Sequence, residues 1–217
     1  MPPPHPFFDP MRMTFEIIFT TIIVLLCGLI YFKTREIYAL TKHKGIFYFR
    51  ATFLFFALAY IFRLIWPIVT LSTMTFDVFI PRRVFMPIIA AATGYVSTMA
   101  LFSLAYTTLW KKIGEKTFII TANIIAVAVS VISIIYRSPE ILLYIQLGLV
   151  ILILIATFKK KFTSTKLMYY LILALWLFSI FTIGIKIRMP FEIKTVLQVV
   201  SIGIFGIIYY KANKWLR

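Results

Sequence analysis

The sequence predicts an all-α, polytopic integral membrane protein: a bundle of seven transmembrane helices with the N-terminus outside and the C-terminus in the cytoplasm. Three observations predict this fold. The chain of 217 residues is 62% hydrophobic with a mean hydropathy of +0.97, whereas a soluble domain is closer to half apolar. The apolar residues lie in long blocks, as they do in spanning helices. Loops rich in Lys and Arg alternate with loops that hold fewer.

The N-terminal segment 1–12 is expected to be a short extracytoplasmic arm. Its prolines favour an extended conformation. It lacks the basic start of a signal peptide, and no small-residue cleavage site follows the first apolar run. The run 13–32 is therefore predicted to be a retained span. The single cysteine, Cys27, lies in this span and cannot form an internal disulfide.

Six further apolar runs complete the transmembrane domain, which covers 13–210 and is followed by a basic cytoplasmic tail over 211–217. A hydrocarbon core of about 30 Å requires about 20 apolar residues. The second and third runs exceed this length and are expected to tilt or project. The fifth and seventh are short, and the lysines beside them can reach the interface. The expected spans are 13–32, 46–71, 84–110, 118–136, 141–158, 167–187 and 195–210.

The basic residues predict the orientation. The segments after the first, third, fifth and seventh spans hold fourteen Lys and Arg residues, and the segments on the other side hold seven. Short cytoplasmic loops are the ones enriched in Lys and Arg, so the first set is expected to face the cytoplasm of a cell membrane. The net charge of +16 is then expected to contact anionic lipid headgroups on the cytoplasmic side, with no nucleic acid as partner.

Arg63 is the most informative polar residue, because it lies eight residues before the outer end of the second span. At 1.5 Å per residue this is roughly 12 Å below the outer interface. A charge at this depth favours either an anion, headgroup or gating site, or a snorkelling or structural ion pair. Glu16 is the first candidate partner, because consecutive antiparallel spans tend to be neighbours. The alternative partners are Asp77, Glu140 and Glu192.

Other candidate site residues lie near Arg63 or on the third span, which is the most polar. Two aromatic residues lie three positions before and after Arg63 on one helix face. The small and hydroxyl residues of the third span favour either helix packing or a polar pathway shared with other spans. The candidates for ligand binding or gating are Arg63, Glu16, Tyr60, Trp66, Thr93, Tyr95, Ser97, Asn123 and Gln198.

Two basic segments on the expected cytoplasmic side favour contacts with lipid or with a membrane or cytoplasmic protein partner. The segment 33–44 has the apolar spacing of a short interfacial helix. The second segment is a run of lysines after the fifth span. The candidate contact residues are Lys33, Arg35, Lys42, Lys44, Lys159, Lys160 and Lys161.

The residues that several classes of membrane enzyme require are missing from the sequence. Enzymes acting on prenyl or nucleotide diphosphates cluster aspartates around magnesium. Intramembrane aspartyl proteases need two embedded aspartates, yet the two in this chain lie near expected outer loops. His5 and His43 form no HExxH motif and lie in no span, so a serine nucleophile would have no histidine base. We therefore expect no catalysis, metal or cofactor.

Three functions remain open. The preferred one is a non-enzymatic, receptor-like or accessory module that senses a lipid, a small molecule or a membrane partner. The second is a transporter or channel for an anionic or neutral small solute, which would use Arg63 and the polar face of the third span. The third is a scaffold subunit of a larger membrane complex.

Overall fold

The computed structural model describes residues 10–76, 82–111, 113–136, 139–158, 174 and 191–214. Within these ranges every regular element is an α-helix, and short turns connect some of the helices. The helices are α1 (Pro10–Thr41), α2 (Lys44–Phe76), α3 (Arg82–Leu109), α4 (Glu115–Tyr136), α5 (Pro139–Phe158) and α7 (Phe191–Lys214). Apart from Ala174, the expected sixth span at 167–187 lies outside the described residues.

Among the described residues, five helices are long and apolar enough to cross a membrane, which indicates a multi-pass membrane protein. They contain the segments Met13–Thr41, Lys44–Val69, Val84–Thr107, Glu115–Tyr136 and Glu192–Asn213. A shorter apolar segment, Ile141–Ile155, lies in α5. The outward faces of the helices carry exposed apolar residues such as Ile124, Leu152 and Val199. Lipid covers surfaces of this kind in membrane helices. The count of seven helices and the orientation stay predictions.

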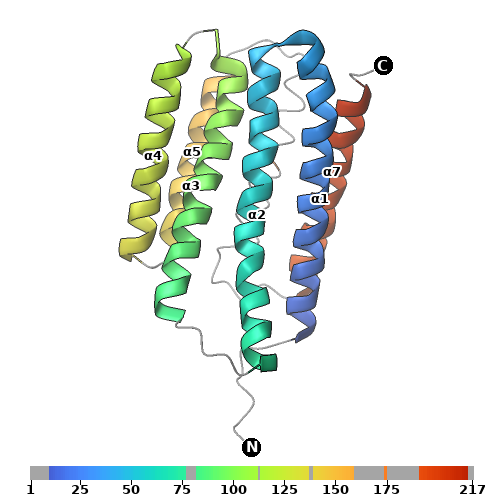
Figure 1. Cartoon of the computed structure of the whole chain (residues 1–217), viewed down its shortest axis with the longest axis vertical. Coiled ribbons are helices and arrows are strands. Elements are labelled where there is room, and N and C mark those ends of the chain that lie inside the picture. Colours follow the sequence, from blue (N-terminus) through green and yellow to red (C-terminus); the bar gives the residue numbers. More distant parts are fainter. Residues whose placement is uncertain are drawn as a thin grey trace, which may run out of the picture.

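The helices stand nearly parallel to one another (Figure 1). Helices α4, α3, α2 and α1 lie side by side in that order, with α5 behind α3 and α4, and α7 behind α1. Helix α2 has its most extensive contacts with α3 and α1. We call the end where α1 finishes and α2 begins the basic end, because Lys42, Lys44 and Lys111 lie there. The other end, where α1 and α7 begin, is the opposite end.

Helix α1 runs nine residues beyond the predicted end of the first span, in place of the separate interfacial helix expected over 33–44. The added segment contains good helix formers and neither Gly nor Pro, so nothing in it stops the helix. The stop comes at Lys42, which has a left-handed φ of 47° and whose N–H donates to the Tyr38 carbonyl at 2.8 Å. This tight turn makes α1 and α2 antiparallel neighbours.

The core consists of two clusters of buried side chains. The larger lies between α1, α2, α3, α5 and α7 and contains Ile23, Phe53, Leu101 and Phe205. The smaller is aromatic and lies at the basic end. Its members Tyr48, Tyr106 and Phe118 join α2, α3 and α4, with Tyr106 and Phe118 stacked at a centroid distance of 4.1 Å. The larger cluster fixes the position of α7 relative to α1 and α2, on which the site described next depends.

Candidate functional site

Three charged side chains from α1, α2 and α7 meet near the opposite end of the bundle. Arg63 Nη2 donates to Glu16 Oε1 at 2.6 Å, and Lys194 Nζ donates to Glu16 Oε2 at 3.3 Å. The exposed fractions of the side chains are 14% for Arg63, 28% for Glu16 and 31% for Lys194. The expected contact of Arg63 with Glu16 is present, and Lys194 adds a second cation that the sequence did not pair with Glu16.

The sequence brings these residues together through helix periodicity. On α2, Phe53, Phe56, Tyr60 and Arg63 lie on one face at spacings of three and four residues. On α7, the face with the same spacings carries Lys194, Gln198, Ser201 and Phe205. Phe205 contacts Phe53 and Phe56 at centroid distances of 6.5 and 5.6 Å. The two helices run in opposite directions, so the same register places Lys194 near Arg63.

Aromatic side chains surround the inward side of the charged group. The Tyr60 ring centroid lies 5.9 Å from Arg63 Cζ. Phe19 of α1 meets Tyr60 edge-on at 6.2 Å, and Phe56 lies 5.2 Å from Tyr60. Together with Phe205, these rings form an apolar layer between the charges and the middle of the bundle. Such a layer keeps the ion pairs in a low-dielectric setting, where charges interact more strongly than in water.

Within the charged group, one positive charge is not neutralised and one hydrogen-bond donor is not used. Two cations share one carboxylate, so the group carries a net charge of about +1 at neutral pH. The second guanidinium nitrogen, Arg63 Nη1, is buried and has no hydrogen-bond partner among the described residues. A buried donor without a partner is costly, and more so on a charged group. Gln198, one turn inward of Lys194, is also buried and forms no hydrogen bond with a described residue. The site therefore combines excess positive charge with unused hydrogen-bonding groups.

Helix α3 forms several hydrogen bonds with its neighbours α4 and α5. The Tyr95 hydroxyl donates to Asn123 Oδ1 on α4 at 2.6 Å, and Ser130 Oγ on α4 donates to the Ala91 carbonyl at 3.0 Å. Gln146 Nε2 on α5 donates to Ser97 Oγ. Interhelical hydrogen bonds of this kind hold membrane helices together. Tyr95, Ser97 and Asn123 are thus not part of the charged group around Arg63.

Two other candidates of the predicted set stand apart from the charged group. Thr93 is half-buried on α3. Trp66 lies in α2, one turn beyond Arg63, and its side chain is outside the described part of the structure. Among the alternative partners of Arg63, Asp77 lies outside the described residues, and Glu192 is exposed at the start of α7.

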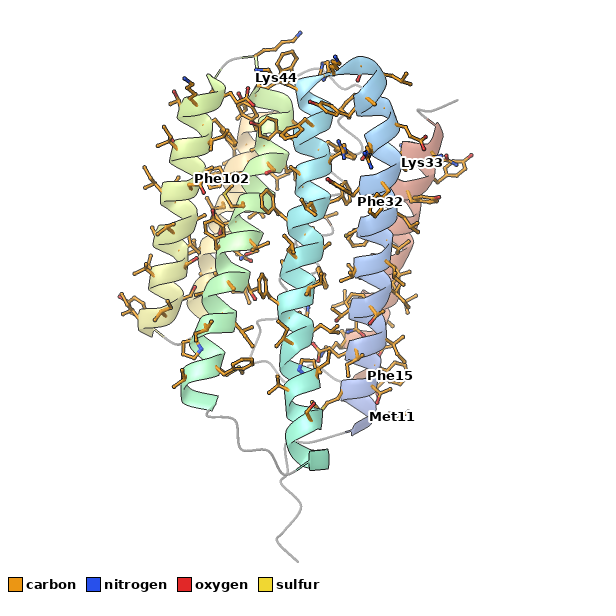
Figure 2. The ribbon with its side chains drawn as sticks, viewed as in Figure 1. Met11, Phe15, Phe32, Lys33, Lys44 and Phe102 are labelled. Carbon is orange, nitrogen blue, oxygen red and sulfur yellow. The ribbon has the colours of Figure 1, made fainter. Side chains whose placement is uncertain are left out.

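Four of the predicted basic contact residues, Lys33, Arg35, Lys42 and Lys44, are described and lie toward the basic end. Lys33 and Lys44 are labelled there in Figure 2, and Met11 and Phe15 mark the opposite end. Lys33 pairs with Glu36 at 3.7 Å, and Lys44 pairs with Glu115 at 2.6 Å. Glu115 also accepts a hydrogen bond from the Tyr48 hydroxyl at 3.0 Å. Arg35 and Lys42 are exposed. Lys159, Lys160 and Lys161 lie outside the described residues. Across the described ranges, no group of three His, Cys, Asp or Glu side chains is close enough to hold a metal ion.

Comparison with known proteins finds a full-length relative. The chain is 29% identical, over the whole of both chains, to an uncharacterized protein of Archaeoglobus fulgidus. No protein-family model matches the chain, and no solved structure matches it. The name of the relative states no ligand or reaction, so the chemistry of the site has to be argued from its geometry.

Proposed function

We propose that this protein is a non-enzymatic, receptor-like or accessory module of the cell membrane that binds an anionic group at Arg63, Lys194 and Gln198. The anionic group is a carboxylate or phosphate, carried by a small molecule or a lipid headgroup. The N-terminus would lie outside and the C-terminus in the cytoplasm, so the site would open toward the outer face. The observation that carries the proposal is the buried Arg63 Nη1 donor, which has no partner among the described residues.

The chemistry of the site favours an anion over a cation or a neutral solute. Glu16 neutralises only one of its two basic neighbours. A guanidinium can bind two oxygens of a carboxylate or phosphate through parallel hydrogen bonds, and Arg63 Nη1 supplies the free donor for the second partner. The amide of Gln198 is positioned one turn inward on the face of α7 that carries Lys194, where it can donate to an oxygen of the same ligand.

The aromatic layer favours binding over conduction. Phe205 contacts both Phe53 and Phe56 on the inward side of the charges, so an anion at Arg63 would meet apolar rings in the direction of the bundle centre. Polar lining is what selective conduction normally requires. A receptor-like role needs no movement of this layer.

Transport of an anionic solute is the second candidate function. The observation in its favour is that a further polar group lies far from either end of its helix without a partner: Thr98 Oγ1 on α3 is buried and unbonded among the described residues. Gln198 on α7 is another buried polar residue. A transport cycle would require the aromatic layer to open. Anion flux into liposomes that stops in Arg63→Gln would support transport over binding alone.

Ligand-induced stabilisation of the purified protein in detergent tests the binding function. The panel contains acetate, phosphate, sulfate and a short-chain anionic phospholipid. A ligand at 100 times its Kd stabilises the folded state by about 2.7 kcal/mol, so at least one anion should raise the melting temperature of the wild type. Arg63→Gln should abolish the rise caused by acetate, which carries no phosphate, and should lower the rise caused by any other anion of the panel that binds the wild type. Lys33→Gln is the matched control, because it removes one positive charge at the basic end. An equal response of Arg63→Gln and wild type would overturn the proposal.

A further inference from the structure

Arg50 is a buried arginine near the basic end that has no carboxylate partner among the described residues. It lies on α2 six residues after the first residue of that helix, Lys44, which is about 9 Å along the helix axis. Its exposed fraction is 8%. Ionised side chains at membrane depth normally pair with another charge or with backbone carbonyls. The surroundings of Arg50 therefore show what kind of partner it can take.

Two tyrosine rings of α1 hold the guanidinium. Arg50 Cζ lies 4.6 Å from the centroid of Tyr31 and 5.5 Å from that of Tyr38. The two tyrosines are seven residues apart and therefore lie two turns apart on one face of α1. Arg50 Nε donates to the Tyr31 carbonyl at 3.5 Å, the long limit for a hydrogen bond. The rings attract the cation through their π faces but carry no net charge, so the charge of Arg50 is left without a counter-ion among the described residues.

The acids that the structure describes at the basic end are already paired. Glu36 contacts Lys33, and Glu115 contacts both Lys44 and Tyr48. The terminal Nη donors of Arg50 have no hydrogen-bond partner among the described residues. The guanidinium is thus held in a fixed place by rings, with its forked donors unused and with no nearby carboxylate of the described chain left to take them.

We propose that Arg50, held between Tyr31 and Tyr38, binds an anionic phosphate group at the basic end of the bundle. A planar guanidinium fork matches two phosphate oxygens, whereas a lysine acts as a point charge. The headgroup region is roughly 5–8 Å thick on each side of a bilayer, so if α2 begins at its outer edge, a depth of about 9 Å puts Arg50 close to the boundary with the acyl chains. The phosphodiester of an anionic lipid and soluble phosphate share this chemistry. This site is separate from the one at Arg63, which lies thirteen residues further along α2.

Titration with a short-chain lipid tests the site. Dioctanoyl phosphatidylglycerol is added to the purified full-length protein in neutral detergent micelles, and its binding is followed by native mass spectrometry. Arg50→Gln should weaken binding by about tenfold or more, because a charge-assisted hydrogen-bonded pair is lost. Arg50→Lys should give an intermediate affinity, because it keeps the charge and loses the fork. Lys116→Gln, which removes an exposed charge at the start of α4, should change the affinity less than about twofold.

Inorganic phosphate distinguishes the two sources. Displacement of the lipid by millimolar phosphate in wild type, but not in Arg50→Gln, would assign the site to soluble phosphate. Lipid binding that depends on Arg50 and resists phosphate would assign it to a headgroup. Wild-type affinity in Arg50→Gln, or equal losses in Arg50→Gln and Lys116→Gln, would overturn the proposal. If Arg50→Gln does not fold, Arg50→Lys decides, and wild-type affinity there overturns it. Arg63→Gln should bind the lipid normally, which separates this test from that of the proposed function.

Discussion

Replacing Glu16 with Gln should destabilise the fold more than replacing Arg63 with Gln, although both changes break the same hydrogen bond. In Glu16→Gln, Arg63 and Lys194 lose their shared carboxylate and face each other as uncompensated cations. In Arg63→Gln, Glu16 keeps Lys194 at 3.3 Å, and the buried Nη1 donor disappears with the guanidinium. The asymmetry follows from the presence of two cations on one carboxylate.

The magnitude follows from the burial of the group. Removing one partner of a fully buried pair costs about 3–5 kcal/mol, and an exposed pair contributes about 0.2–1 kcal/mol. The three side chains are 14–31% exposed, so we expect a cost of about 2–3 kcal/mol for Glu16→Gln. Arg63→Gln should cost about 1–2 kcal/mol on the same scale. Combining Glu16→Gln with Arg63→Gln should lower the free energy of unfolding by no more than Glu16→Gln alone, because the remaining cation, Lys194, can extend to water.

Equilibrium unfolding of the purified protein in mixed micelles, driven by sodium dodecyl sulfate, measures these free energies. Glu36→Gln is the matched control: it removes a carboxylate from an exposed pair at the other end and should cost less than about 0.5 kcal/mol. A larger cost for Arg63→Gln than for Glu16→Gln would refute the reasoning. Additive costs in the double variant would also refute it, because residues that share one ion-pair network do not act independently.

Three further predictions concern other parts of the bundle. Gln146→Leu removes the hydrogen bond from α5 to Ser97. It should lower the free energy of unfolding by about 0.6 kcal/mol, the average contribution of an interhelical hydrogen bond in a membrane protein. A loss several times larger would contradict a packing role. Gly94→Val should lower the melting temperature, because a Cβ at this position would lie only 3.1 Å from Leu142 Cδ1. Gly148→Val should leave the melting temperature unchanged, because no atom lies within 4 Å of a Cβ built at that position. In a Cys27→Ser background, a cysteine at Lys42 should react with an impermeant maleimide only after cells are permeabilised; labelling of intact cells would reverse the predicted orientation.

The positions of the helices were predictable because their apolar runs are long, but the helix ends were less so. The prediction ended the first span at residue 32, where charged residues begin, yet α1 continues to Thr41. Charge marks where a helix leaves the hydrocarbon region, not where its backbone hydrogen bonding stops. The actual stop requires the left-handed φ of Lys42, for which the sequence offers no glycine at that position and hence no clear signal.

The candidate site was predictable where neighbouring spans form it. Spans joined by a short turn are antiparallel neighbours, and from this rule the contact between Glu16 and Arg63 was predicted. Lys194 was missed as the second partner because the packing of α7 against α1 joins residues 178 positions apart, and helix order is not encoded in local periodicity. Arg50 was passed over for a similar reason: the rings of Tyr31 and Tyr38 lie across the turn between α1 and α2, and the flanking apolar residues gave no indication of them.

The two arginines of α2 pose the same physical problem and meet it differently. They lie thirteen residues apart, about 20 Å along the helix, within a hydrocarbon region of about 30 Å. If the helix is centred, each guanidinium lies about 5 Å inside an interface, within the reach of a snorkelling side chain. At the opposite end α1 supplies a carboxylate, Glu16, whereas at the basic end it supplies only the rings of Tyr31 and Tyr38. An anion at Arg63 must therefore share the cation with Glu16, while an anion at Arg50 has no internal competitor. It follows that the anionic lipid content of the membrane should affect the stability of the protein more strongly through Arg50 than through Arg63.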